Sequence, residues 1–133
     1  MQKTFMNSHL WSELCEVLKN HPGNTGIAKV NRLWKKNPSN TKPDPLPTLK
    51  ESDLSILGEG WGVDALWTLV HEKQVTENEP WSNNGAVIVL RWGGNHYLLD
   101  GRRRINQGRR AGLAGLHRVL VLVPIDGISG RSQ

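Results

Sequence analysis

The chain has 133 residues, which is enough for one compact domain with a modest core. Its 17 lysines and arginines outnumber its 12 acidic residues, and the net charge of +5 favours acidic partners such as nucleic acid, nucleotides or anionic surfaces. The single cysteine excludes an internal disulfide and a cysteine-rich zinc site. A single cysteine fits the reducing cytoplasm, and no apolar run is long enough to span a bilayer, so we expect a cytoplasmic protein without a membrane partner.

The first fifty residues predict two helices and a connector. Apolar residues at helical spacing predict a helix over residues 8–20, with Ser8 as its N-cap. Residues 26–37 predict a second helix with one apolar face. Its other face is basic and carries Lys29, Arg32, Lys35 and Lys36. Prolines recur between residues 37 and 50 and exclude a regular helix or an inner strand, so we expect an extended connector there.

The middle of the chain gives weaker signals. Residues 51–57 predict only a short element. Residues 61–75 predict a helix, and the residues expected to face inward are Val63, Leu66, Trp67 and Val70. Residues 76–85 are polar and predict a loop.

The last third predicts a strand, a hairpin, a helix and a strand. The continuous apolar run 86–92 is typical of a central strand, the turn 93–95 closes a hairpin, and 96–100 is the returning strand. A helix is then expected over residues 101–114, and a final strand over 117–124.

The start of the helix over 101–114 carries consecutive arginines. Arg102, Arg103 and Arg104 fall in its first turn, where the free backbone N–H groups and the helix dipole already make the end positive. Cations there are unfavourable unless an anion lies in the same place, so this end is a candidate phosphate site. The alternative is a solvated helix face, with Asp100 as a helix cap that partly offsets the charge.

Small residues mark one side of the same helix. Gly101, Ile105, Gly108 and Gly112 recur at helical spacing and form a face that is nearly bare of side chains. Glycine inside a helix costs roughly 1 kcal/mol relative to alanine. Such a face makes sense if the helix backbone packs closely against the sheet.

These residues resemble the ParB/sulfiredoxin-like superfamily over residues 86–124. Gly101, Arg103 and Arg104 match the "GERR" box of the ParB N-terminal nuclease-like domain, and the run "AGL" at 111–113 matches the end of the helix that follows the box. The hairpin "AVIVLRWGGNHYLLDG" is also similar to the family's hairpin. Arg102 departs from the pattern, because it replaces the box glutamate and stands where sulfiredoxins carry their catalytic cysteine.

The resemblance implies an α+β fold with a small mixed β-sheet flanked by helices. On this basis we expect one compact unit in which residues 51–125 form the ParB/sulfiredoxin-like domain and 126–133 a short tail. Residues 1–37 are expected to be an N-terminal helical extension, and 38–50 the proline-rich connector. The tail is too short for the helix-turn-helix and dimerisation domains of full partition proteins.

The resemblance also implies a phosphate site built on the arginine box. Gly101 would let the backbone approach a phosphate, and the arginines would contact its oxygens. The residues predicted to bind phosphate or nucleotide are Gly101, Arg102, Arg103, Arg104, Asn106, Arg109 and Arg110. The basic face formed by Lys29, Arg32, Lys35 and Lys36 is a secondary candidate for contact with a nucleic-acid backbone.

Three classes of function remain open from the sequence. The first, which we favour, is a binding module for nucleotide or DNA phosphates in a DNA-associated or mobile-element regulatory role. The second is a metal-dependent nuclease or NTP hydrolase in which Asp100 is catalytic and Mg²⁺ enters with a nucleoside triphosphate. The third is an effector or inhibitor that binds another protein. We expect no histidine or cysteine metal site.

Overall fold

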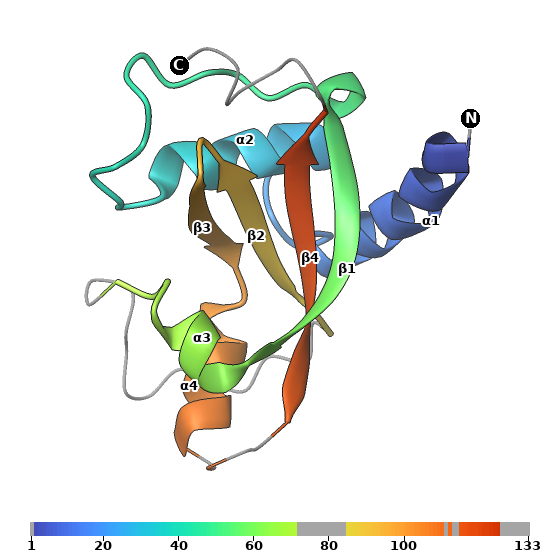
Figure 1. Cartoon of the computed structure of the whole chain (residues 1–133). Coiled ribbons are helices and arrows are strands. Elements are labelled where there is room, and N and C mark those ends of the chain that lie inside the picture. The colour runs from blue at the N-terminus through green and yellow to red at the C-terminus, as the bar shows by residue number, and fades with distance from the viewer. Residues whose placement is uncertain (1, 72–84, 111, 113–114, 126–133) are drawn as a thin grey trace.

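The computed structural model describes residues 2–71, 85–110, 112 and 115–125, which form an α+β fold around a four-stranded mixed sheet (Figure 1). The strands are β1 (Leu54–Gly62), β2 (Val87–Trp92), β3 (Asn95–Asp100) and β4 (Leu116–Pro124), in the order β1-β4-β2-β3. β2 and β4 pair in parallel, whereas β1 with β4 and β2 with β3 pair antiparallel. The predicted α+β class, mixed sheet and hairpin over 86–100 are confirmed.

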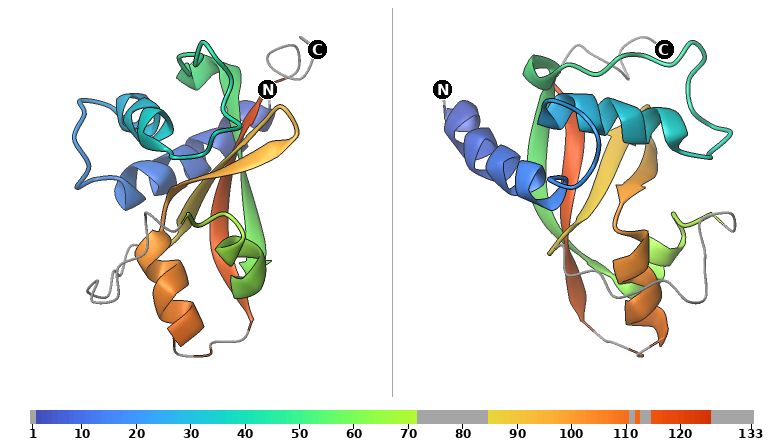
Figure 2. Two further views of the ribbon diagram at one scale, coloured as in Figure 1. Left: turned by 90° about the vertical axis from the view of Figure 1, so that its left-hand side faces the viewer. Right: turned by 180° about the vertical axis from the view of Figure 1, so that it is seen from behind.

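Helices lie on both sides of this sheet. They are α1 (Gln2–Val17), α2 (Gly26–Lys36), α3 (Val63–Trp67) and α4 (Arg102–Arg110), and a 3-10 turn, η1 (Glu51–Asp53), precedes β1. Seen from behind, α1 and α2 lie across one face of the sheet (Figure 2, right). α3 and α4 lie together at the end where β2 begins and β3 ends (Figure 1).

Each face of the sheet has its own apolar core. Leu14, Leu18 and Trp34 of the N-terminal helical region pack with Ile88 and Leu120 on one face. On the other face, the side chains that pack together are Leu66, Val87, Val89, Leu98, Ile105, Val119 and Val121. β2 and β4 are interior strands covered on both faces, which explains their continuous apolar runs.

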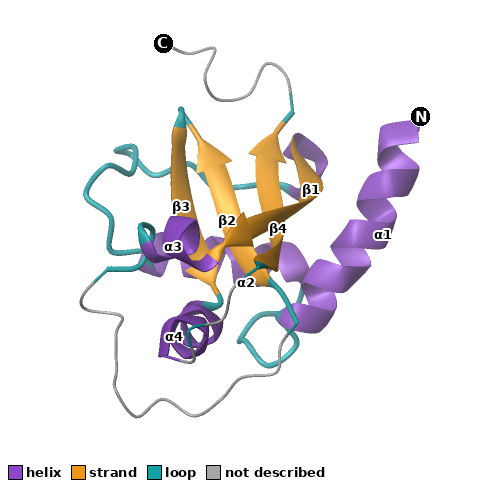
Figure 3. Cartoon of the chain, turned by 60° about the horizontal axis from the view of Figure 1, so that its bottom comes forward, coloured by secondary structure: helices purple, strands orange, loops and turns teal. Residues whose placement is uncertain are grey.

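β1 does not stay flat against its neighbour. It pairs with β4 from Leu54, opposite Pro124, to Gly62, opposite Leu116. Towards its end it bends across the other strands in the direction of α3 (Figure 3). Gly58 and Gly60 lie in the second half of β1, and a Cβ on either would stand 3.0 Å from the side chain of Arg118 or Leu116 respectively. The bend brings side chains of an edge strand over β2 and β3.

The predicted helix over 61–75 is wrong at its start and too long. Trp61 and Gly62 belong to β1, because their backbones pair with β4, and α3 then spans only Val63–Trp67. Leu66 is buried as predicted, while Val63, Trp67 and Val70 are half-buried. The rest of that prediction, the loop over 76–85 up to residue 84, and the tail over 126–133 lie outside the described residues.

The other helices differ from prediction at their ends. α1 begins at Gln2, so Ser8 is inside the helix and is not its N-cap. α2 begins at Gly26 as predicted and ends at Lys36, one residue earlier than predicted, and it is capped by Thr25, whose Oγ1 accepts a hydrogen bond from the backbone N–H of Ala28. α4 ends at Arg110, and the left-handed φ of +64° at Gly112 ends the helical path earlier than predicted. No helix among the described residues is long and apolar enough to cross a membrane.

Candidate functional site

A cavity lies between the N-terminal helices and the arginine segment. Its volume is about 720 Å³, within the roughly 300–1,000 Å³ typical of small-molecule sites. Val17, Leu33 and Leu99 contribute apolar lining. The cationic side chains that line it are Lys36, Arg102, Arg103 and Arg104. Among the described residues that line the cavity, Asp100 is the only carboxylate.

The arginines reach the cavity because α4 starts directly beside β2. β3 ends at Asp100, Gly101 turns the chain with a φ of +111°, and the Ile105 N–H donates to the Gly101 carbonyl at 3.1 Å. A Cβ on Gly101 would stand 2.9 Å from Cγ2 of Val87 and 3.0 Å from its Cα. Close packing against Val87 therefore explains why glycine occupies position 101. The resemblance separately implies that this glycine lets the backbone approach a phosphate.

Asp100 is held by a histidine that the sequence did not single out. Oδ1 of Asp100 lies 3.2 Å from Nε2 of His21, and the Asp100 side chain is 16% exposed. His21 sits in a turn after α1, where its backbone N–H donates to the Leu18 carbonyl at 2.9 Å. Burial raises the pKa of Asp100 above its ordinary value, against the opposing effects of His21, the Gly101 backbone and Arg103.

The C-terminal end of α2 forms another wall of the cavity. Asn37 is buried, and its Nδ2 donates to the Leu98 carbonyl at 2.8 Å, which ties this end of the helix to β3. Its Oδ1 accepts a hydrogen bond from the Ser39 N–H at 2.9 Å. Lys36 precedes Asn37 and is thereby placed beside the arginines. Lys36 was predicted as part of a separate basic face, and the structure brings it into the lining of this cavity.

The other predicted phosphate-binding residues lie apart from this cavity. Arg109 and Arg110 occupy the last turn of α4, and at about 1.5 Å per residue they stand roughly 10 Å along the helix from Arg103. The Arg109 guanidinium stacks on Trp67 of α3, 3.9 Å from the ring centroid. Asn106 is buried on α4 and is not among the lining residues. Lys29, Arg32 and Lys35 also lie outside the lining.

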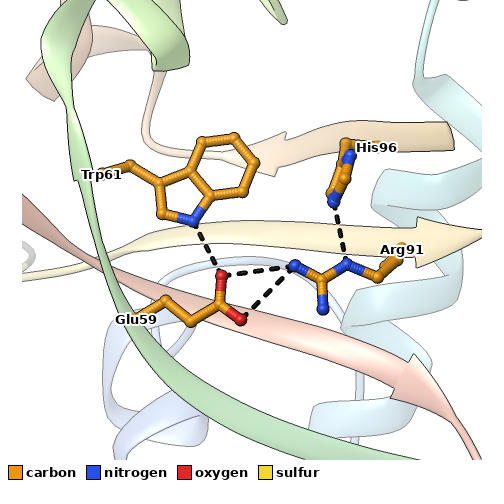
Figure 4. A network of polar contacts seen from close by, with 4 residues as sticks. All are labelled: Glu59, Trp61, Arg91 and His96. Carbon is orange, nitrogen blue, oxygen red and sulfur yellow. Dashed lines mark hydrogen bonds and ion pairs between the residues drawn. The ribbon is translucent and has the colours of Figure 1, made fainter.

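A second polar cluster lies on the opposite face of the sheet (Figure 4). Arg91 of β2 donates through Nε to His96 Nε2 at 2.8 Å, and its Nη2 lies 3.3 Å from Oε1 of Glu59. Glu59 also accepts a hydrogen bond from Trp61 Nε1 at 2.9 Å. Trp61 and His96 meet edge to face, with centroids 5.3 Å apart, because β1 bends across the sheet. Burial and the neighbouring Arg91 lower the pKa of His96.

The donor set of the cavity suits phosphate and does not suit a protein-held Mg²⁺. Magnesium takes oxygen ligands, usually one or two carboxylates together with phosphates and water. Asp100 supplies the only carboxylate lining the cavity in the described chain, and it is already engaged by His21. No group of three or more His, Cys, Asp or Glu side chains among the described residues could hold a metal.

Sequence reasoning missed His21 and Glu59 because their partners are distant in the chain. His21 followed by Pro22 and Gly23 indicated only the end of a helix. Glu59 lies in a stretch in which glycine alternates with larger residues, a pattern that weakens a strand prediction. Comparison of the chain with family models, curated proteins and solved structures found no match.

Proposed function

We propose that the cavity binds a phosphate group of a nucleotide or of DNA, and that the protein is a ParB-like binding module. The observation that carries the proposal is the convergence of Arg102, Arg103, Arg104 and Lys36 on one cavity. The three arginines also stand at the N-terminal end of α4, where the helix dipole favours an anion. Arginine suits this task because its planar fork of donors matches phosphate oxygens.

The electrostatics of the cavity favour an anion more strongly than the net charge alone does. Four cationic side chains and one carboxylate line it among the described residues. A bound phosphate would offset the mutual repulsion of the arginines through charge-assisted hydrogen bonds.

The same features favour binding over hydrolysis. Metal-assisted phosphoryl chemistry generally needs several oxygen ligands around the metal. Among the described residues the cavity offers one carboxylate, that of Asp100, which already contacts His21. The ParB-like interpretation rests on the box at residues 100–104 followed by a helix and a strand, with Arg102 in place of the box glutamate.

Melting temperatures of the wild type and Arg104→Ala, with and without inorganic phosphate, test the proposal. Phosphate should raise the melting temperature of the wild type by an amount set by its concentration over its dissociation constant. Arg104→Ala should weaken phosphate binding about tenfold to a hundredfold, since a hydrogen bond to a charged group contributes about 1.5–3 kcal/mol. Arg110→Ala is the matched control, because Arg110 is exposed on the same helix and outside the cavity lining.

The outcome also locates the site. If phosphate raises the melting temperatures of the wild type and Arg104→Ala equally, the anion binds elsewhere and the proposal is wrong. If it raises neither, the cavity is no phosphate site. A binding screen with CTP, ATP, GTP, and single-stranded and duplex DNA then identifies the ligand to which the phosphate belongs.

A further inference from the structure

The basic face of α2 continues from the cavity. At about 100° per residue, Lys29, Arg32 and Lys36 lie within about 60° of one another around the helix, and we call them the α2 stripe. Lys36 lines the cavity and is the last residue of α2, directly before the C-cap residue Asn37. α2 contains no acidic residue, so the stripe is not neutralised from within its own helix.

One end of the stripe, Lys36, lines the cavity. Leu33 and Lys36 both line it, and Lys29 lies four residues before Leu33 on the same side of α2. Seven residues separate Lys29 from Lys36, which corresponds to roughly 10 Å along the helix. Positive charge therefore extends from the arginine box, over Lys36, to a line of side chains outside the cavity.

From this continuity we infer that the occupant is the phosphorylated end of a single-stranded nucleic acid, with the end phosphate on Arg102–Arg104 and the following phosphates along the α2 stripe. The inference rests on the proposed function and names its ligand. A mononucleotide would use the arginine box and make no contact with Arg32 or with Lys29, whose Nζ also donates to the Lys19 carbonyl at 3.4 Å. A strand would use both parts of the positive surface.

The charge and size of the cavity favour an end over the middle of a strand. A terminal phosphate monoester carries about −1.5 to −2 charges at neutral pH, more than a phosphodiester does. Three arginines and a lysine around one cavity match that higher charge. The cavity of about 720 Å³ has the size of a small-molecule site and would admit one unstacked nucleotide, while a base-paired duplex would remain outside.

The test measures affinity against strand length. Oligothymidylates of increasing length, each with a 5′-phosphate, a 3′-phosphate or neither, are titrated against the full chain alongside inorganic phosphate and thymidine monophosphates. Affinity should rise over the first few nucleotides and then level off, and removal of the end phosphate should weaken binding at least tenfold. The 5′ and 3′ arms show which end enters the cavity.

Two variants with the same loss of charge separate the stripe from general attraction. Lys29→Gln/Arg32→Gln removes the outer part of the α2 stripe, whereas Lys35→Gln/Lys50→Gln removes two exposed cations outside it. The first variant should reduce the affinity of long strands to that of the mononucleotide and lower the salt slope by about 1.4, at about 0.7 per phosphate contact. It should leave the affinity for inorganic phosphate unchanged. The control should bind strands as the wild type does.

The possible failures are distinguishable. If phosphate and mononucleotide bind but strand length has no effect, the inference is wrong and the proposed function stands. Equal losses in both double variants, or equal binding of a blunt duplex, also overturn the inference. If phosphate, mononucleotides and strands all fail to bind, the proposed function itself is wrong.

Discussion

Nε2 of His21 lies 3.2 Å from Oδ1 of Asp100, so the turn after α1 is tied to the residue that leads into α4. The contact joins the N-terminal helical region to the arginine box. It also engages the one carboxylate that lines the cavity among the described residues. The sequence left two roles open for Asp100, a helix cap and a catalytic residue. The structure adds a contact with His21 that joins two parts of the fold.

Asp100→Asn should strengthen phosphate binding at pH 7. The variant keeps an oxygen acceptor for His21 and removes a negative charge from the cavity wall. Repulsion between the Asp100 carboxylate and a phosphate about 4 Å away would cost about 1 kcal/mol where water screens the charges, which is about fivefold in the dissociation constant. Isothermal titration with inorganic phosphate measures the change. Weaker binding in the variant would mean that the carboxylate holds the ligand.

The same substitution should change how stability depends on pH. The pKa of Asp100 is raised in the folded chain, so the folded state binds more protons than the unfolded state between the two pKa values. The stabilisation that protonated Asp100 contributes is present below the pKa of the unfolded state and is lost as pH rises through the pKa of the folded state. The melting temperature of Asp100→Asn relative to wild type should therefore increase as pH rises from acid to neutral.

Asp100→Ala tests the enzymatic alternative. The binding-module proposal predicts no turnover of DNA or nucleoside triphosphate by the wild type, with or without Mg²⁺. If the wild type does cleave one of these substrates and Asp100→Ala abolishes the cleavage, the catalytic interpretation of the arginine box replaces the binding interpretation. Cleavage that persists in the variant would exclude Asp100 as the catalytic group.

His96 should make the fold less stable in mild acid. Its Nε2 accepts a hydrogen bond from Arg91, so protonation would remove the acceptor and place two positive charges side by side. The pKa of His96 is lowered from 6.5, so its contribution to stability is present above about pH 6.5 and is lost as pH falls through the folded pKa. Chemical denaturation of wild type and His96→Gln at pH 7.5 and pH 5.5 measures this, because glutamine keeps an acceptor and does not titrate. Equal pH dependence in both proteins would contradict the prediction.

Local sequence signals predicted the last third of the fold well. The hairpin, α4 and β4 follow one another in the chain, and each has its own signal in apolar runs, turn glycines or helical spacing. The buried side chain of Ile105 and the close packing of Gly108 agree with the predicted small-residue face. Gly112 does not belong to that face, because α4 ends before it.

Signals that depend on distant pairing were missed. β1 is a strand because nine of its residues pair with β4, which lies at the other end of the chain. The glycines of β1 weakened the strand signal in the sequence, so Trp61 was predicted to be the start of a helix. Only the arginine side of the cavity was predicted, for the same reason. The arginines are a local motif, but His21 and Lys36 reach them through the packing of α1 and α2 on the sheet.

Arg109 should stabilise the fold rather than bind phosphate. Its guanidinium lies over the Trp67 ring and connects α4 to α3. An exposed cation–π contact contributes about 0.5–1 kcal/mol. Arg109→Gln should therefore lower the free energy of unfolding by about that amount, and Trp67→Leu should remove most of the difference between Arg109 and Gln in a double-mutant cycle. A large loss of phosphate affinity in Arg109→Gln would restore the predicted binding role.

Gly101 should tolerate alanine less well than Gly108 does, although both lie in the glycine-rich segment. At Gly101 the φ of +111° is left-handed, and the added Cβ would meet the backbone Cα of Val87 at 3.0 Å. Strain of about 1–2 kcal/mol and overpacking of about 1–3 kcal/mol act together at this position. At Gly108 the nearest atoms, on His117 and Val63, are at 3.3 Å, and alanine gains up to about 1 kcal/mol in helix propensity.

We expect Gly101→Ala to lower the free energy of unfolding by several kcal/mol and to weaken phosphate binding by shifting the start of α4. Gly108→Ala should change stability by about 1 kcal/mol or less and leave binding intact. Urea denaturation and phosphate titration of the two variants measure both effects. Wild-type stability in Gly101→Ala would show that the arginine box does not depend on the close approach of Gly101 to β2.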